Sequence, residues 1–165
     1  ESLAKRNPTE LGFAETPEEA ERLWEARRSA LAALSRLKPT TILEDITVPR
    51  SKIPDMVRAI ERISEETGIL IGTFGHAGDG NLHPTILTDE RNEAEMRKAH
   101  EAAERIFKTA IELGGTLSGE HGIGLSKAPF LRLEIQEPTM SAIKALKRAF
   151  DPQGILNPGK AYSCT

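Results

Sequence analysis

Two short apolar segments separated by an Asp79-Gly80 dipeptide place the strongest constraint on the fold of this chain. Residues 69–76 and 82–88 are each too short for most helices, and their composition is typical of β-strands. Asp-Gly between two such segments is a strong signal for a two-residue hairpin turn. The sequence therefore predicts an antiparallel pair of strands near the middle of the chain.

Helix signals lie on both sides of this hairpin. Thr16 followed by Pro17 is typical of a helix start, and apolar residues at helical spacing predict a helix that continues to Pro39. Helices are also predicted over 51–67, 89–113 and 138–150, and short strands within 40–49 and at 116–118. The order α-β-α-β-β-α-β-α, without an internal repeat, indicates an α+β fold with helices on one face of the sheet.

Composition excludes several classes of protein. The 165 residues, 38% of them apolar, suffice for one domain with a core. A net charge of −3, from 22 basic and 25 acidic residues, argues against nucleic acid as a partner. No apolar run reaches the roughly 18 to 20 residues of a transmembrane helix. Cys164 is the single cysteine, so a cytoplasmic location is expected, and the start at Glu1 without a methionine indicates a piece of a longer protein.

The predicted hairpin carries two of the four histidines. With a two-residue turn, His76 lies directly opposite His83, with Cβ atoms roughly 4.5 to 5.5 Å apart. The opposite face of the hairpin is apolar and is expected to face the core, with Ile69, Ile71, Leu82 and Ile86. Two imidazoles this close, facing away from the core, could share one divalent metal ion. A pair of ordinary surface or core histidines fits the hairpin register equally well.

A second polar cluster lies in the glycine-rich segment that follows the 89–113 helix. Glu120 and His121 are neighbours, and they can serve one site only if the backbone bends, which Gly119 and Gly122 permit. The Glu120 carboxylate would complete a set of two histidines and one carboxylate, and His121 would act as a general base. The alternative is a turn with two exposed polar residues. His100, on the long helix, is expected to be solvated.

Neither glycine cluster, 75–80 or 119–124, has the order typical of a nucleotide-binding loop, so no cofactor-binding fold is visible in this chain. One helical arginine is a candidate for binding a substrate carboxylate. Arg27 and Arg28 lie beside Trp24 and interrupt the polar and apolar pattern of the first helix. An ordinary surface ion pair explains such an arginine as well.

Three segments together resemble one family: GHAGDGNLHP at 75–84, SGEHGIG at 118–124 and FDPQGILNPGK at 150–160. In this order and spacing they are similar to the carboxyl-terminal part of the FAD-linked oxidases that act on D-2-hydroxy acids. Within that family the glycolate oxidases are the most similar, followed by the D-lactate dehydrogenases. The resemblance extends from about Trp24 to Lys160.

The resemblance implies a two-part architecture. An amino-terminal domain, absent from this chain, would bind FAD, and residues 1–150 would form a cap domain that binds the substrate. The cap is expected to be ferredoxin-like, with an antiparallel sheet and helices packed on one face. Residues 151–165 would form a tail that returns to the FAD domain, and Asn157 in this tail is the candidate contact with the cofactor.

The resemblance also implies roles for the polar residues. The positions that match the metal ligands of the family are His76, His83 and Glu120, and the metal would be zinc, manganese or iron. The position of the family's base is His121, and the arginine three residues after the tryptophan, Arg27, is expected at the substrate carboxylate.

The implied reaction is the oxidation of a small 2-hydroxy acid to the 2-oxo acid, with transfer of a hydride to flavin. Relatives that use D-2-hydroxyglutarate often carry a lysine where this chain has Leu43, which favours glycolate or D-lactate. Expected partners are the FAD domain of the same polypeptide and other oxidase subunits, which could bring the protein to the membrane periphery. The chain alone is expected to be inactive. Alternatives are a stand-alone module that binds a metal or a small acid, and a metal-dependent hydrolase, which leaves the tail motif unexplained.

Overall fold

The computed structural model describes residues 12–163, which divide into two units on either side of the Ala33–Leu34 bond. The first unit contains helix α1 (Pro17–Arg28) and the start of α2 (Ala30–Leu34). The Thr16 hydroxyl caps α1 by accepting a hydrogen bond from the Glu19 amide at 3.2 Å. The prediction that α1 starts after Thr16 is therefore confirmed.

The continuous helix predicted up to Pro39 is wrong, because the helix is interrupted at Ser29. The Ser29 hydroxyl donates to the carbonyl oxygen of Glu25 at 2.9 Å. A serine that bonds back to the preceding turn in this way competes with the helical backbone and favours a bend. The apolar spacing of the sequence continues across Ser29, and for this reason periodicity alone missed the interruption.

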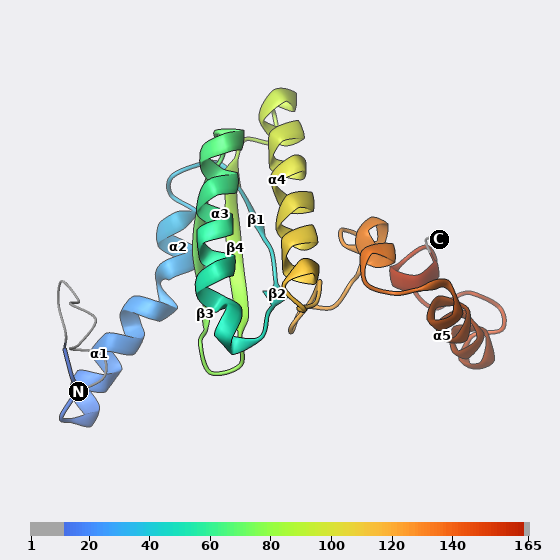
Figure 1. The fold of residues 1–165 in the computed structure, drawn as a ribbon, viewed down its shortest axis with the longest axis horizontal. Helices are drawn as coiled ribbons and strands as arrows, with labels where there is room; N and C mark the ends of the chain where they lie inside the picture. The colour runs from blue at the N-terminus through green and yellow to red at the C-terminus, as the bar shows by residue number, and fades with distance from the viewer. Residues whose placement is uncertain (1–11, 164–165) are drawn as a thin grey trace. The chain divides into compact units, whose positions relative to one another are not determined.

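Four strands form the sheet of the second unit in the described part of the chain: β1 (Thr40–Leu43), β2 (Ile46–Thr47), β3 (Leu70–His76) and β4 (Asn81–Thr88). All pairings are antiparallel, with β4 between β3 on one side and β1 and β2 on the other (Figure 1). The one strand predicted within 40–49 is thus two, separated by Glu44 and Asp45. The strand predicted at 116–118 is reduced to a single bridge between Thr116 and Thr47.

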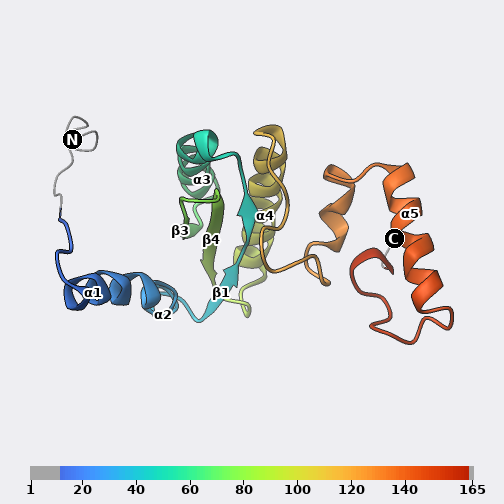
Figure 2. The ribbon, with the colours of Figure 1, turned by 90° about the horizontal axis from the view of Figure 1, so that it is seen from below.

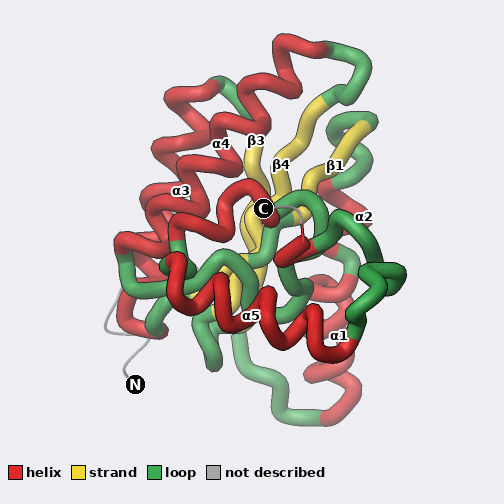
Figure 3. Tube along the Cα trace, turned by 90° about the vertical axis from the view of Figure 1, so that its right-hand side faces the viewer, coloured by secondary structure: helices red, strands yellow, loops and turns green. Residues whose placement is uncertain are grey.

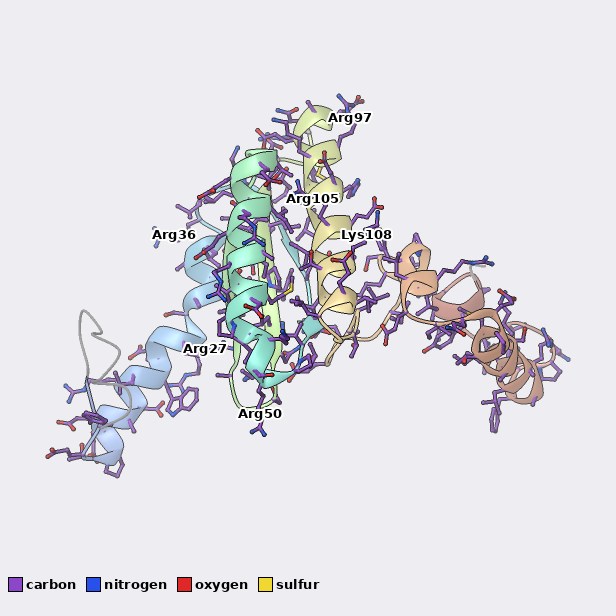
Figure 4. The ribbon with its side chains drawn as sticks, viewed as in Figure 1. Arg27, Arg36, Arg50, Arg97, Arg105 and Lys108 are labelled. Atoms are coloured by element: carbon purple, nitrogen blue, oxygen red, sulfur yellow. The ribbon has the colours of Figure 1, made fainter. Side chains whose placement is uncertain are left out.

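Two long helices cover one face of this sheet. Helix α3 (Ile53–Thr67) follows a turn of 3₁₀ helix, η2 (Arg50–Lys52), and α4 (Glu93–Glu112) runs beside it (Figures 2 and 3). The core lies between the two layers and includes Met56, Ile60, Leu82, Ile86, Ile106 and Phe107. Arg105 of α4 forms an ion pair with a glutamate of α3 on the exposed side (Figure 4). This arrangement confirms the predicted α+β fold.

The remaining elements lie after the sheet in sequence. They are η3 (Ala128–Leu133), α5 (Glu137–Phe150) and η4 (Ala161–Ser163). Helix α5 matches the predicted helix at 138–150 and ends where the predicted tail begins. Between residues 12 and 163, no helix combines the length and the apolar character needed to cross a lipid bilayer. The single cysteine, Cys164, lies outside the described residues.

Candidate metal and catalytic site

The β3–β4 hairpin sets the positions of the two candidate histidines. His76 pairs with Asn81, and His83 pairs with Phe74, so the loop spans the four residues 77–80. The predicted two-residue turn, with His76 directly opposite His83, is therefore wrong. The error is a shift of two residues, which keeps both side chains on one face of the sheet.

The longer loop has a local cause. Asp79 accepts a hydrogen bond from the Asn81 amide at 3.0 Å, and the Gly80 amide donates to the carbonyl of His76 at 3.0 Å. Gly80 has a φ of +85°, and a Cβ at this position would collide with the carbonyl oxygen of Val48. The loop is thus closed by an aspartate side chain and docked on a neighbouring segment, which the Asp-Gly pair alone did not reveal.

The two histidines differ in their environment. Their rings pack edge to face, with centroids 5.7 Å apart. The side chain of His76 is 45% exposed, whereas that of His83 is 6% exposed. Both histidines lie on the face of the sheet away from the core, as expected, but the rings of Phe74 and His121 pack against His83, with centroids 5.5 and 5.2 Å from its own.

The second candidate cluster is folded around the carboxylate of Asp45, which is fully buried between β1 and β2. Four donors of the 118–121 segment reach this carboxylate: the Ser118 hydroxyl at 2.7 Å and the amides of Gly119, Glu120 and His121 at 2.9, 3.0 and 2.9 Å. The side-chain amide of Asn81 donates to the other oxygen at 2.7 Å. The backbone therefore bends between Ser118 and His121, as a shared site for Glu120 and His121 requires.

A buried lysine balances the charge of Asp45. The ammonium group of Lys127 lies 3.6 Å from the carboxylate and donates to the carbonyl oxygens of Asp45 and Leu117, at 2.7 and 2.8 Å. Burial alone would raise the pKa of Asp45, but hydrogen bonds from His121, Asn81 and Ser118 outweigh it and hold this pKa well below its usual range. Asp45 is therefore a charged anchor at neutral pH.

The bend brings the two clusters together. Glu120 Oε2 lies 3.8 Å from His83 Nε2, and Glu120 Oε1 lies 4.0 Å from His76 Nε2. The ring of His121 stacks on that of His83, with centroids 5.2 Å apart and an angle of 18° between the planes. The predicted ligands, His76, His83 and Glu120, thus meet at one place with the predicted base, His121.

The three side chains fit a divalent cation. Their ligand atoms all lie within 4.8 Å of one another. Ligand atoms ~2.1 Å from a tetrahedral zinc ion lie about 3.4 Å apart, so these atoms would approach by roughly 0.4 to 1.4 Å to hold an ion. Burial lowers the pKa of His83, against the opposing charge of Asp45, so its imidazole is neutral at pH 7, as a metal ligand must be. The donor set suits zinc, manganese or iron.

A second group, Asp45, His83 and His121, also has ligand atoms within 4.8 Å of one another. The oxygens of Asp45 already accept hydrogen bonds from five groups, whereas no hydrogen bond to the carboxylate of Glu120 is found within residues 12–163. The group that contains Glu120 is therefore the better candidate for holding an ion.

Two further residues predicted from the sequence are Arg27 and Asn157. Arg27 is half-buried on α1, in the first unit, and its place beside a substrate stays a prediction (Figure 4). Asn157 is exposed in the tail, with a φ of +47°. It lines a cavity of about 330 Å³ together with Lys147, Leu156, Lys160, Ala161 and Tyr162. A cofactor contact at Asn157 also stays a prediction.

Sequence reasoning missed the residues that hold the cluster in place, chiefly Asp45 and Lys127. One signal was available: Glu44 and Asp45 are adjacent acids between the strand residues Ile42 and Ile46, where side chains are expected to be buried. Burial raises the pKa of Glu44 to about 7, an effect that Lys127 opposes. Two adjacent acids within an apolar segment of the sequence therefore indicate a buried polar cluster.

Comparison with known proteins identifies the family of the chain. Residues 1–161 match the family described as FAD linked oxidases, C-terminal domain. The chain is 61% identical over 164 residues to the glycolate oxidase subunit GlcD of Bacillus subtilis (strain 168), covering 99% of this chain and 35% of that protein. It is 37% identical over 158 residues to GlcD of Escherichia coli (strain K12), covering 96% and 32%.

A mitochondrial D-lactate dehydrogenase [cytochrome] of Arabidopsis thaliana is 32% identical over 159 residues, covering 95% of this chain and 28% of that protein. The chain thus spans about a third of the length of these relatives. The match over residues 1–161 covers almost the whole chain. The chain therefore belongs to the FAD linked oxidases and corresponds to their C-terminal domain.

Proposed function

We propose that this chain is the substrate- and metal-binding part of a longer FAD-dependent enzyme that oxidises a small 2-hydroxy acid to the 2-oxo acid. The observation that carries the proposal is the meeting of His76, His83 and Glu120 beside the ring of His121. Two relatives named GlcD and one named D-lactate dehydrogenase support glycolate or D-lactate as the substrate.

The chain's own residues account for binding and for proton transfer. His76, His83 and Glu120 would hold a divalent cation, which supplies a positive charge for the hydroxyl and carboxylate oxygens of the substrate. His121 is exposed and is free to meet a substrate held beside His83. Histidine is the side chain best suited to accept a proton near neutral pH, so His121 would take the hydroxyl proton.

The remaining requirements are an electron acceptor and an anchor for the substrate. FAD, bound mainly by a domain outside this chain, would accept the hydride that leaves the hydroxyl-bearing carbon. Arg27 would bind the substrate carboxylate, because guanidinium and carboxylate groups pair through two parallel hydrogen bonds. The partner subunits and the cytoplasmic location expected from the sequence are part of the same proposal.

Replacement of His83 tests the proposal in the full-length protein. His83→Ala removes the buried member of the ligand set, so we expect loss of the bound metal and of glycolate or D-lactate oxidation. Metal content is measured by elemental analysis and oxidation by reduction of an artificial electron acceptor. Normal turnover by a variant without metal would refute the metal role.

The matched control is His100→Ala, which removes an exposed histidine of α4 and should change neither the metal content nor the rate. A screen of D- and L-2-hydroxy acids then identifies the substrate. Metal binding without oxidation of any of these acids by the full-length, FAD-loaded protein would favour a binding module over an enzyme. The chain alone, without its flavin domain, should bind the metal but have no flavin absorbance and no activity.

A further inference from the structure

We propose that Asp45 is the positioning residue of the candidate metal site, because its carboxylate holds the 118–121 loop and lies 3.9 Å from the imidazole of His83. The inference rests on the proposed function, since it assumes that His76, His83 and Glu120 bind a metal ion. Asp45 is not itself a ligand in this scheme. It acts through the groups that it orients.

The carboxylate of Asp45 holds the 118–121 loop in place. The Gly119, Glu120 and His121 amides and the Ser118 hydroxyl all converge on Asp45. Hydrogen bonds to an ionised acceptor are roughly twice as strong as neutral ones. They fix the backbone of Glu120 and His121, so the directions of the carboxylate and of the base depend on Asp45. A Cβ at Gly119 would collide with Asn81 and Thr47, which leaves the loop little room to move.

Asp45 also lies beside the ring of His83. Its Nε2 faces Glu120, and its Nδ1 lies 3.9 Å from Asp45 Oδ1. Among residues 12–163, this buried Nδ1 makes no hydrogen bond of ordinary geometry, and the backbone of Glu44 is a second acceptor near the ring. A histidine that ligates a metal through one ring nitrogen usually donates the other N–H to a carboxylate, which fixes the tautomer and the ring. This distance is about 1 Å longer than an ordinary hydrogen bond of ~2.9 Å, so the two atoms would have to approach by about 1 Å for the N–H to be donated to Asp45.

Asp45 connects two segments that are far apart in the sequence. Asp45 is 0% exposed and lies 75 residues before Glu120 in the sequence. Lys127 fixes the backbone on both sides, since it binds the carbonyls of Asp45 and Leu117. The sheet, through Asp45, therefore sets where the loop ligand Glu120 meets the strand ligand His83.

Metal affinity in the full-length protein tests this inference. Asp45→Asn keeps the shape of the side chain but replaces one acceptor oxygen with an NH₂ group that faces donors. We expect Mn²⁺ and Zn²⁺ to bind about 10- to 100-fold more weakly, the usual effect of removing an outer partner of a ligand. Ser118→Ala removes one of the donors, and a smaller loss of affinity in the same direction is expected. The visible spectrum of the Co²⁺-loaded protein reports the change in ligand geometry.

The matched control is Asp151→Asn, which removes another buried aspartate that binds backbone amides and a lysine. It should leave the metal affinity and the Co²⁺ spectrum unchanged. Equal affinity and an unchanged spectrum in Asp45→Asn, or an equal loss in Asp151→Asn, would overturn the inference and leave the proposed function intact. If Asp45→Asn fails to fold, Ser118→Ala decides by the same readouts. A wild-type protein that binds none of these ions would overturn both the inference and the metal role.

Discussion

Asp45 and Asp151 are two buried aspartates that perform the same local task in different regions of the chain. Each accepts hydrogen bonds from backbone amides and pairs with a lysine, Lys127 or Lys147. The partners of Asp151 all lie within five residues of it, whereas those of Asp45 in the loop lie 73 to 76 residues away.

Asp151 therefore makes local contacts only, whereas Asp45 joins distant segments of the chain. Asp151 ties Ile155 and Leu156 back to the end of α5 and orders a turn of the tail. Asp45 joins the sheet to a distant loop, so its contacts form only when the whole second unit folds. A disturbance at Asp45 should therefore change stability and the candidate site together, whereas one at Asp151 should remain local.

The largest loss of stability is expected from replacing Lys127, with Lys147 as the comparison. Lys127→Met leaves the buried Asp45 carboxylate without its nearby cation, so we expect the free energy of unfolding to fall by about 3–5 kcal/mol. Lys147→Met removes a lysine that is one-third exposed, and a much smaller loss is expected. Urea denaturation of both variants measures the difference. Equal losses would contradict the distinction between the two aspartates.

A smaller effect is expected from glycines near each aspartate. A Cβ at Gly119 would collide with Asn81 and Thr47, so Gly119→Ala should reduce the free energy of unfolding by about 1–3 kcal/mol and weaken metal binding. Gly154 has a φ of +65° but open space around it. Gly154→Ala should therefore cost some backbone strain and leave metal affinity unchanged, which titration with Mn²⁺ can establish. Weaker metal binding in Gly154→Ala would show that the tail and the site are coupled.

The same contrast between local and distant contacts explains what the sequence could predict. The predicted helix over 51–67 follows from signals within a few residues, and α3 ends at Gly68, whose backbone is left-handed. The meeting of His76, His83 and Glu120 was expected partly from hairpin geometry and partly from the family resemblance. The two histidines still meet because a shift of two residues in the register keeps both on one face of the sheet.

Long-range contacts were beyond the reach of local patterns. The 40–49 segment divides into two strands at Glu44 and Asp45, and the partners of Asp45, Ser118 and Lys127, lie far along the chain. Periodicity gives no information about such pairs. The burial of His83 likewise depends on tertiary packing against His121, so the hairpin predicted the face on which His83 lies but not its exposure.

The smallest expected effect is a local response to acid in the tail. The ion pair with Lys147, helped by the Leu156 and Ile155 amides, holds the pKa of Asp151 below its usual range. A carboxylate whose pKa is lower in the folded state stabilises that state above its unfolded pKa of ~3.9, and this contribution is lost as the pH falls through the folded value. The turn at 151–156 should therefore be intact at pH 7 and loosen below about pH 4.

The amide chemical shifts of Ile155 and Leu156, followed by NMR from pH 7 to pH 2, measure this loosening. In Asp151→Asn the two amides should already have the shifts of the loosened turn at pH 7 and should not titrate. If they titrate in the variant as they do in the wild type, another group controls the turn. If the core amides of α3 and α4 change at the same pH as Ile155 and Leu156, the tail does not respond locally, and the contrast with Asp45 fails.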